Sequence, residues 1–304
     1  IGGGKDSVVT VELLAAARMH PVQFAVNPNQ VIFRVGRVKG HPVIPATRAI
    51  DERLLELNSE GALNGHVPVT AINSLISLVQ ARIIGLGPVV MSLEASASEA
   101  TLVWDGVEVN HQWSKSEEAE GLLHDMLGPQ AGLSAGAYFS LLRPYSELKI
   151  ARYFSGLREY HPVITSCNRA FRRGVDDARW CANCDKCRFI FLILSPFLPA
   201  SALIRMFAAN LLDDSRQIEG YRSLLGLAEH RPFECVGEQA ESMVALTWIT
   251  HQEDWKKSVV VTALVSEIPE LLTPHPELEA QVLGHRDGIC GMPGGYEHLG
   301  AILA

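Results

Sequence analysis

The chain begins with Ile1-Gly2-Gly3-Gly4-Lys5-Asp6-Ser7, a run whose residue types suit the binding of an anion. Glycines let backbone N–H groups close around a phosphate, and the apolar helical pattern that follows would point the positive end of a helix at it. Lys5 adds a cation, Asp6 a carboxylate that can hold magnesium, and Ser7 a hydroxyl donor. The spacing is not that of a Walker A loop. The alternative is a glycine-rich turn that caps an ordinary helix.

Three cysteines between residues 181 and 187 are separated by two residues each, a spacing typical of a metal site. Zinc prefers four ligands, and the nearest remaining cysteine lies across an ordinary loop of 13 residues. We therefore expect a structural zinc held by Cys167, Cys181, Cys184 and Cys187. His161 or Cys235 is the alternative fourth ligand. An iron–sulfur cluster, a redox-active pair and reduced cysteines without metal are the other interpretations.

The elements that position these residues are predicted from periodicity. Apolar runs predict parallel strands at 22–26, 88–93 and 138–142, and Asp105-Gly106 predicts a hairpin over 102–109. Helical spacing predicts helices at 7–19, 51–58, 68–84, 114–127 and 145–157, whereas 29–50 is ambiguous. The alternation predicts an α/β fold in which helices cover both faces of a parallel sheet. A mainly helical part follows from about residue 185, and its apolar run 189–204 predicts two buried helices.

Composition restricts the class of protein. With 304 residues, 47% of them hydrophobic and 20% charged, the chain is long and apolar enough for one large domain or two smaller ones. The net charge of −8 argues against a nucleic-acid partner. Bunched cysteines indicate metal binding in a reducing compartment rather than disulfides, so we expect a cytoplasmic protein. No secretory signal is visible, and the most apolar run contains two prolines and is too short to span a membrane.

The first loop resembles the Ser-Gly-Gly-x-Asp-Ser pyrophosphate loop of the N-type ATP pyrophosphatases. Gly3, Gly4, Asp6 and Ser7 match it, with Lys5 at the free position and Gly2 in place of the first serine. This resemblance implies an adenine nucleotide alpha hydrolase-like fold that splits ATP between the α- and β-phosphates. Such a loop normally leaves the end of a strand, so we expect the chain to be part of a longer protein whose first strand lies before residue 1.

In a sheet of this kind the ligand binds beyond the carboxyl ends of the strands. The loops that begin at Gly2, Asn27 and Glu94 are therefore expected to converge on ATP, with Ser96 in the third loop. The expected domains are an ATP-binding α/β domain at 1–184, which includes the cysteine cluster, a helical subdomain at 185–270, and a tail of unknown role at 271–304.

Further motifs extend the resemblance to one family. These are Asn64-Gly-His-Val-Pro-Val-Thr70, Asn110-His-Gln-Trp-Ser-Lys115, Thr165-Ser-Cys-Asn168, the Cys181–Cys187 cluster and Phe233-Glu-Cys-Val-Gly-Glu238. With the glycine-rich loop, they resemble the ATP-dependent UDP-N-acetylmuramoyl-L-alanyl-L-glutamate epimerases of bacterial peptidoglycan synthesis, from Gly2 to about Trp255. Family members carry a further N-terminal region.

The resemblance implies that ATP adenylates the α-carboxylate of the terminal L-glutamate and releases pyrophosphate. A base then removes the α-hydrogen, a proton returns on the other face, and hydrolysis leaves D-glutamate and AMP. A carboxylate stabilises an adjacent carbanion poorly because it is already an anion, so removing its charge lowers the barrier. ATP, magnesium and zinc are the implied cofactors, and a nucleotide-sugar peptide is the implied substrate.

Roles follow for particular side chains. The loop residues Gly2 to Ser7 are expected to hold the departing pyrophosphate, with Lys5 offsetting its charge and Asp6 binding magnesium. His66, His111, Lys115 and Cys235 are the candidate bases, and the resemblance does not settle which of them act. His111 is the first choice because polar side chains surround it, although a hydrogen-bonded structural histidine fits as well. The candidate substrate contacts are Arg143, Arg169, Arg172 and Trp113.

Two other functions stay open. One is a different adenylate-forming enzyme on the same fold, such as a 7-cyano-7-deazaguanine synthase-like nitrile or amide synthase, because those enzymes share the loop, the order of cysteines and a structural zinc. The other is a zinc-stabilised binding module that senses ATP without splitting it. The oligomeric state does not follow from the sequence.

Overall fold

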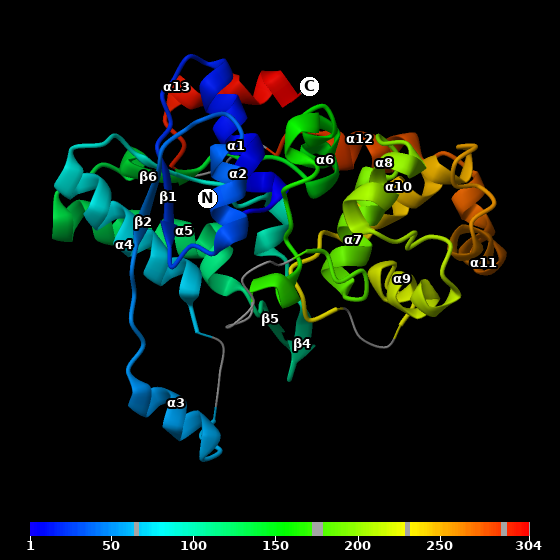
Figure 1. The fold of residues 1–304 in the computed structure, drawn as a ribbon, viewed down its shortest axis with the longest axis horizontal. Coiled ribbons are helices and arrows are strands. Elements are labelled where there is room, and N and C mark those ends of the chain that lie inside the picture. The colour runs from blue at the N-terminus through cyan, green and yellow to red at the C-terminus, as the bar shows by residue number, and fades with distance from the viewer. Residues whose placement is uncertain (64–66, 172–178, 229–231, 287–290, 304) are drawn as a thin grey trace.

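The computed structural model describes residues 1–63, 67–171, 179–228, 232–286 and 291–303 (Figure 1). The N-terminal half mixes helices with short strands, and the C-terminal half is helical. The strands are β1 (Gln23–Val26), β2 (Val43–Ala46), β3 (Val89–Met91), β4 (Leu102–Trp104), β5 (Val107–Val109) and β6 (Tyr138–Ser140). The chain is thus an α/β protein in which helices predominate.

The strands form three small sheets within the described ranges, and the extended parallel sheet that we expected is not among them. β1 pairs with β2 in parallel, β3 pairs with β6 in parallel, and β4 pairs with β5 as an antiparallel hairpin. Each strand has only three or four residues, which leaves little edge for a third partner. The predicted hairpin at 102–109 is confirmed, with Asp105 and Gly106 both at positive φ in its turn.

The helices of the N-terminal half lie near their predicted positions, except for the one in the ambiguous region 29–50, which was not predicted. They are α1 (Lys5–Ala16), α2 (Gln30–Arg37), α3 (Glu52–Ser59), α4 (Val69–Ile84), α5 (Glu117–Ala131) and α6 (Glu147–Ser155). The ambiguous region 29–50 resolves into a helix followed by a strand, because Asn29 caps α2 through its side chain and Pro42 precedes β2. In Figure 1, α3 extends away from the rest of the molecule.

The C-terminal half is built from helices around α7. They are α7 (Asp185–Leu194), α8 (Ala200–Phe207), α9 (Ile218–Leu224), α10 (Gln239–Thr250), α11 (Val259–Glu267), α12 (Pro276–Leu283) and α13 (Gly294–Glu297). The two helices predicted for 189–204 are confirmed as α7 and α8, but only α7 is buried as expected, because α8 buries just Leu203 and Phe207. Short 3-10 helices complete the description: η1 (Ala95–Ser98), η2 (Trp113–Lys115), η3 (Ala135–Ala137), η4 (Arg158–Tyr160), η5 (Asn168–Phe171), η6 (Ser215–Gln217), η7 (Pro269–Leu272) and η8 (His298–Leu303).

One continuous core joins the two halves. α6 packs against α1 on one side and α7 on the other, and α7 also packs against α9 and α10. Buried side chains of this core extend from Val8 to Leu303, so part of the region 271–304 is packed into the body. The division at residue 184 therefore remains a proposal. None of the helices in the described part of the chain has both the length and the apolar run of a bilayer-spanning helix.

Candidate active site

The glycine-rich loop is clamped between two other segments. Gly3 has φ +80°, and a Cβ on it would lie 3.2 Å from Val31 Cγ1 of α2 and 3.4 Å from the ring of Phe171. A Cβ on Gly4 would lie 3.1 Å from Ser166 Cβ, and Thr165 N donates to Gly3 O at 3.1 Å. The left-handed backbone favours glycine at residue 3, and a Cβ there would also require the Val31 side chain to shift slightly.

The same loop is closed by Ser7. The Ser7 hydroxyl accepts a hydrogen bond from Gly2 N at 3.2 Å and donates one to Gly4 O at 3.0 Å. Gly4 is the N-cap of α1, and no described side chain caps that helix. The first-turn N–H groups of α1 and the loop therefore form a concentration of backbone donors beside Lys5.

Lys5 is buried next to two carboxylates. Its Nζ pairs with Asp6 and with Glu147, and the second oxygen of Glu147 accepts a hydrogen bond from Lys186 Nζ at 3.2 Å. Burial lowers the pKa of Lys5 from its usual value, and the Asp6 carboxylate opposes that shift. Neither Glu147 nor Lys186 was predicted, because Glu147 is 142 residues from Lys5 in the chain and no local pattern connects them.

A second cluster joins Cys235 to the 110–115 segment. Cys235 Sγ donates to Gln112 Oε1 at 2.8 Å, and Lys115 Nζ lies 3.1 Å from the same sulfur and 3.2 Å from Gln112 Oε1. An adjacent ammonium stabilises the negative charge that a thiol carries after it loses its proton. The arrangement suits a thiol that gives and receives a proton.

His111 lies at the edge of that cluster. Its Nδ1 is 2.5 Å from Thr101 Oγ1, and its ring centroid is 4.7 Å from that of Phe233. Burial, and then the charge of Lys115, lower the pKa of His111, which favours the neutral imidazole at neutral pH. A small pocket is lined there by Ser96, Glu99, Ala100, Thr101, His111, Gln112, Pro232, Glu234 and Val236.

Arg143 connects two predicted site segments. Its guanidinium donates to Lys115 O at 2.8 Å and to Glu94 O at 3.0 Å, and it forms a buried ion pair with Glu120 at 2.9 Å. Ser96 Oγ in turn donates to Glu94 Oε1 at 3.1 Å. These contacts give Arg143 an internal positioning role, whereas its contact with substrate stays a prediction.

The two clusters are linked through Lys186. Lys186 Nζ contacts Glu147 beside Lys5, and Lys186 N donates to Glu234 Oε2 at 2.8 Å, next to Cys235. The charge of Glu94 also acts on Lys5, where it opposes the lowering of the pKa that burial causes. The glycine-rich loop is thus connected through Lys186 to the 233–238 segment, whereas the convergence of the loops at Gly2, Asn27 and Glu94 on ATP stays a prediction.

Other predicted residues take different positions. Asn27 binds Arg48 through two hydrogen bonds, at 2.8 and 2.7 Å, and the helix that follows it reaches Gly3. Trp113 is 43% exposed and donates to Glu118 at 2.7 Å, and Arg169 is exposed. The predicted residues His66 and Arg172 lie outside the described residues.

The four predicted zinc ligands meet. The sulfur atoms of Cys167, Cys181, Cys184 and Cys187 all lie within 4.8 Å of one another, and the Cys181 and Cys187 sulfurs are 3.7 Å apart. A tetrahedral zinc–thiolate site has sulfur atoms about 3.8 Å apart. The alternative ligands are bound elsewhere, His161 to Phe154 O and Cys235 to Gln112. The donor set and its spacing fit zinc.

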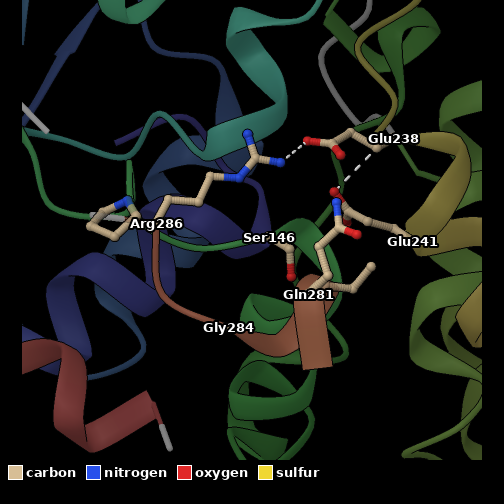
Figure 2. A pocket seen from close by; sticks show the side chains of 8 residues that line it. Ser146, Glu238, Glu241, Gln281, Gly284 and Arg286 are labelled. Carbon is tan, nitrogen blue, oxygen red and sulfur yellow. Dashed lines mark hydrogen bonds and ion pairs between the residues drawn. The ribbon is translucent and has the colours of Figure 1, made fainter. Parts of the chain in front are cut away.

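A further pocket opens at the start of α6 and was not predicted. Figure 2 shows Arg286 and Glu238 pointing toward each other, with Ser146, Glu241 and Gln281 around them. Glu241 accepts a hydrogen bond from Leu148 N at 2.9 Å. Burial and the neighbouring Glu238 raise the pKa of Glu241 to about 8.

Comparison with known proteins gives two family matches along the chain. Residues 1–141 match the MurL N-terminal domain, and residues 163–279 match the MurL C-terminal domain. No solved structure matches the chain.

Three curated relatives are named UDP-N-acetyl-alpha-D-muramoyl-L-alanyl-L-glutamate epimerase. The protein of Salinispora tropica is 54% identical over 271 residues, that of a Micromonospora species 53% over 270, and that of Xanthomonas oryzae pv. oryzae 42% over 279. These matches cover 89%, 89% and 90% of this chain, and 59%, 60% and 61% of the respective relatives. The chain thus spans about 60% of their length.

Proposed function

Because this chain carries both domains of the MurL family, we propose that it forms part of an epimerase that converts the terminal L-glutamate of UDP-N-acetylmuramoyl-L-alanyl-L-glutamate to D-glutamate for peptidoglycan synthesis. The three relatives with that name support this assignment. The whole protein, with the additional length that the relatives have, is the unit to which the activity belongs. We expect it to act in the cytoplasm, on a small-molecule substrate.

We propose that ATP supplies the driving force through a pyrophosphate loop at residues 2–7. A substrate carboxylate oxygen would attack the α-phosphorus, the bond to the β-phosphate would break, and pyrophosphate would leave. In this proposal the backbone N–H groups of the loop and of the first turn of α1, which no side chain in the described part of the chain caps, would bind that anion together with Ser7 and the ammonium of Lys5. Asp6, which is 23% exposed, would hold a magnesium ion that offsets phosphate charge.

Proton transfer at the α-carbon needs groups that accept and return a proton. We assign one of these roles to Cys235, because Lys115 is positioned to stabilise its thiolate and Gln112 orients it. We assign the other to His111, whose lowered pKa keeps the imidazole neutral and able to accept a proton. The α-hydrogen would pass to one group while the opposite face receives a proton from the other.

The four-cysteine cluster would hold zinc in a structural role. It would tie the segment that carries Cys167 to the start of α7, and the same segment contacts Gly3 through Thr165 N. We also propose that the N-terminal domain belongs to the pyrophosphate-loop superfamily. The loop and the parallel pairs β1–β2 and β3–β6 are consistent with that placement.

The observation that carries the proposal is the connection between Lys5 in the glycine-rich loop and the cluster around Cys235. Adenylation and proton transfer must act on one glutamate residue, on its carboxylate and on the neighbouring carbon. Lys186 contacts Glu147 beside Lys5 through its side chain and Glu234 beside Cys235 through its backbone. The two kinds of chemistry are therefore held close to each other.

The test uses the full-length protein with ATP, magnesium and the L-Glu substrate in deuterated water. We expect AMP, pyrophosphate, D-glutamate and deuterium at the α-carbon. Cys235→Ala should still release AMP and pyrophosphate while stereoinversion is lost. If the wild type forms AMP without stereoinversion, the protein is a different adenylate-forming enzyme. If it binds ATP without releasing pyrophosphate, it is a sensing module.

A further inference from the structure

Glu147 is a buried carboxylate held between two lysines. It is the first residue of α6, one of its oxygens pairs with Lys5 Nζ, and the other accepts from Lys186 Nζ at 3.2 Å. The exposed fractions of the three side chains are 2% for Glu147, 1% for Lys5 and 9% for Lys186. All three charges are therefore removed from water, and their positions depend on one another.

The backbone at Glu147 is held in place by contacts of the residues before and after it. Ser146 caps α6 by accepting a hydrogen bond from Lys149 N at 3.1 Å, and Leu148 N donates to Glu241 at 2.9 Å. The backbone that carries the carboxylate is thus anchored by two independent contacts. Glu147 can therefore position a flexible lysine rather than follow it.

Charge balance makes Glu147 essential to that arrangement. Lys5 and Lys186 contribute two positive charges, which Glu147 and Asp6 balance. Without Glu147, the two buried ammonium groups would repel each other, with the partly exposed Asp6 as the remaining ion-pair partner of Lys5 and the charge of Glu94 also acting on it. Their repulsion would move Lys5 out of its place in the glycine-rich loop.

We propose that Glu147 is a positioning residue that fixes the Lys5 ammonium in the glycine-rich loop, and that Lys186, at the start of α7, holds Glu147 in turn. The inference rests on the proposed function, in which Lys5 offsets the charge of the departing pyrophosphate. Glu147 is buried and pairs with Lys5, so in this proposal it needs no contact with the nucleotide. Its effect passes entirely through Lys5.

A double-mutant cycle on the full-length protein tests the proposal. Glu147→Gln should lower kcat for pyrophosphate release about tenfold or more while KM for ATP changes less than about threefold, because the charge on the leaving group develops in the transition state. Lys5→Met should cause a similar loss. The double variant should be no slower than Lys5→Met alone, because the carboxylate then has no lysine to position.

The same variants can also be compared by their Kd for inorganic pyrophosphate, measured by calorimetry with magnesium. This binding measurement does not require that the protein catalyses any reaction. Glu147→Gln should weaken binding about tenfold, with no further loss in the Lys5→Met background. If the wild type binds pyrophosphate and shows this pattern but makes no D-glutamate, the proposed function fails and the positioning role stands.

Glu12→Gln is the matched control, because Glu12 also lies on α1 but interacts with Tyr160 and Lys39 instead of Lys5. This variant should leave kcat unchanged. Tighter pyrophosphate binding in Glu147→Gln would mean that Glu147 competes with the anion, and it would overturn the proposal. Losses that multiply in the double variant would also overturn it. Should the glutamine variant not fold, Glu147→Asp carries the same cycle, with a smaller loss expected.

Discussion

Arg143 offers the clearest test of how the candidate site is held together. Arg143→Met leaves the Glu120 carboxylate buried without its cation, since the exposed fractions of the two side chains are 1% and 3%. Breaking a buried ion pair on one side costs about 3–5 kcal/mol. The substitution also removes the donors to Lys115 O and Glu94 O. We therefore expect the free energy of unfolding to fall by about 3–5 kcal/mol.

A second substitution separates the charge effect from the lost packing. Glu120→Gln keeps an oxygen that can accept the hydrogen bond from Ser140 N, 2.9 Å away in the wild type, but removes the charge. The double variant should therefore be more stable than Arg143→Met alone by about 1–2 kcal/mol, because no unpaired charge stays buried. The two carbonyl groups would still lack their donor.

Urea unfolding followed by circular dichroism at pH 7 gives these values. Arg53→Met is the control, because Arg53 is 59% exposed and its ion pair with Glu56 is a surface pair, so no measurable change is expected. A loss below about 1 kcal/mol for Arg143→Met, or a double variant less stable than the single one, would refute the buried-charge account.

Three further predictions follow from the loop, the cysteines and the second pocket. Cys187→Ser should reduce bound zinc in the purified full-length protein from about one equivalent to less than about one tenth, measured by atomic emission, and less than half an equivalent in the wild type would contradict the site. Gly3→Ala should lower the free energy of unfolding by about 1–2 kcal/mol in urea titrations, because its φ is +80° and Val31 is in contact, and an unchanged midpoint would contradict the strained backbone. Folding raises the pKa of Glu241 from 4.5 to about 8. Between these pH values the Glu241 carboxyl is ionised in the unfolded state but still protonated in the folded state, so the free energy of unfolding falls as pH rises. Glu241→Gln should therefore gain stability relative to the wild type between pH 5 and pH 8.5 in thermal melts, and a constant difference would count against the raised pKa.

Local chemistry explains which elements were predictable. The helices at α1, α4 and α6 follow apolar spacing with glycine, serine or proline at their ends, and the hairpin follows Asp105-Gly106. The cysteine set was predictable because short spacing in the chain places sulfurs on one ion. Each of these signals lies within a few residues of the feature that it predicts.

The rest depends on contacts between distant residues. The predicted strands and the hairpin were located, but β2 lies in a region whose pattern was ambiguous, and the pairing of the strands in three small sheets depends on contacts between segments far apart in the chain. Glu147 carries no motif, and it matters only because folding brings it to Lys5. The contacts of Arg143 with Glu120 and two carbonyl groups could not be predicted either, because its position in the sequence does not indicate them, and its expected contact with substrate stays a prediction.

The central claim is that adenylation at the glycine-rich loop serves proton exchange at Cys235 and His111. Its most direct test is mass spectrometry of the substrate glutamate after turnover by the full-length protein in deuterated water, with and without ATP. The account predicts one deuterium at the α-carbon of D-glutamate only when ATP is present, together with AMP. D-glutamate formed without ATP, or without deuterium, would contradict it.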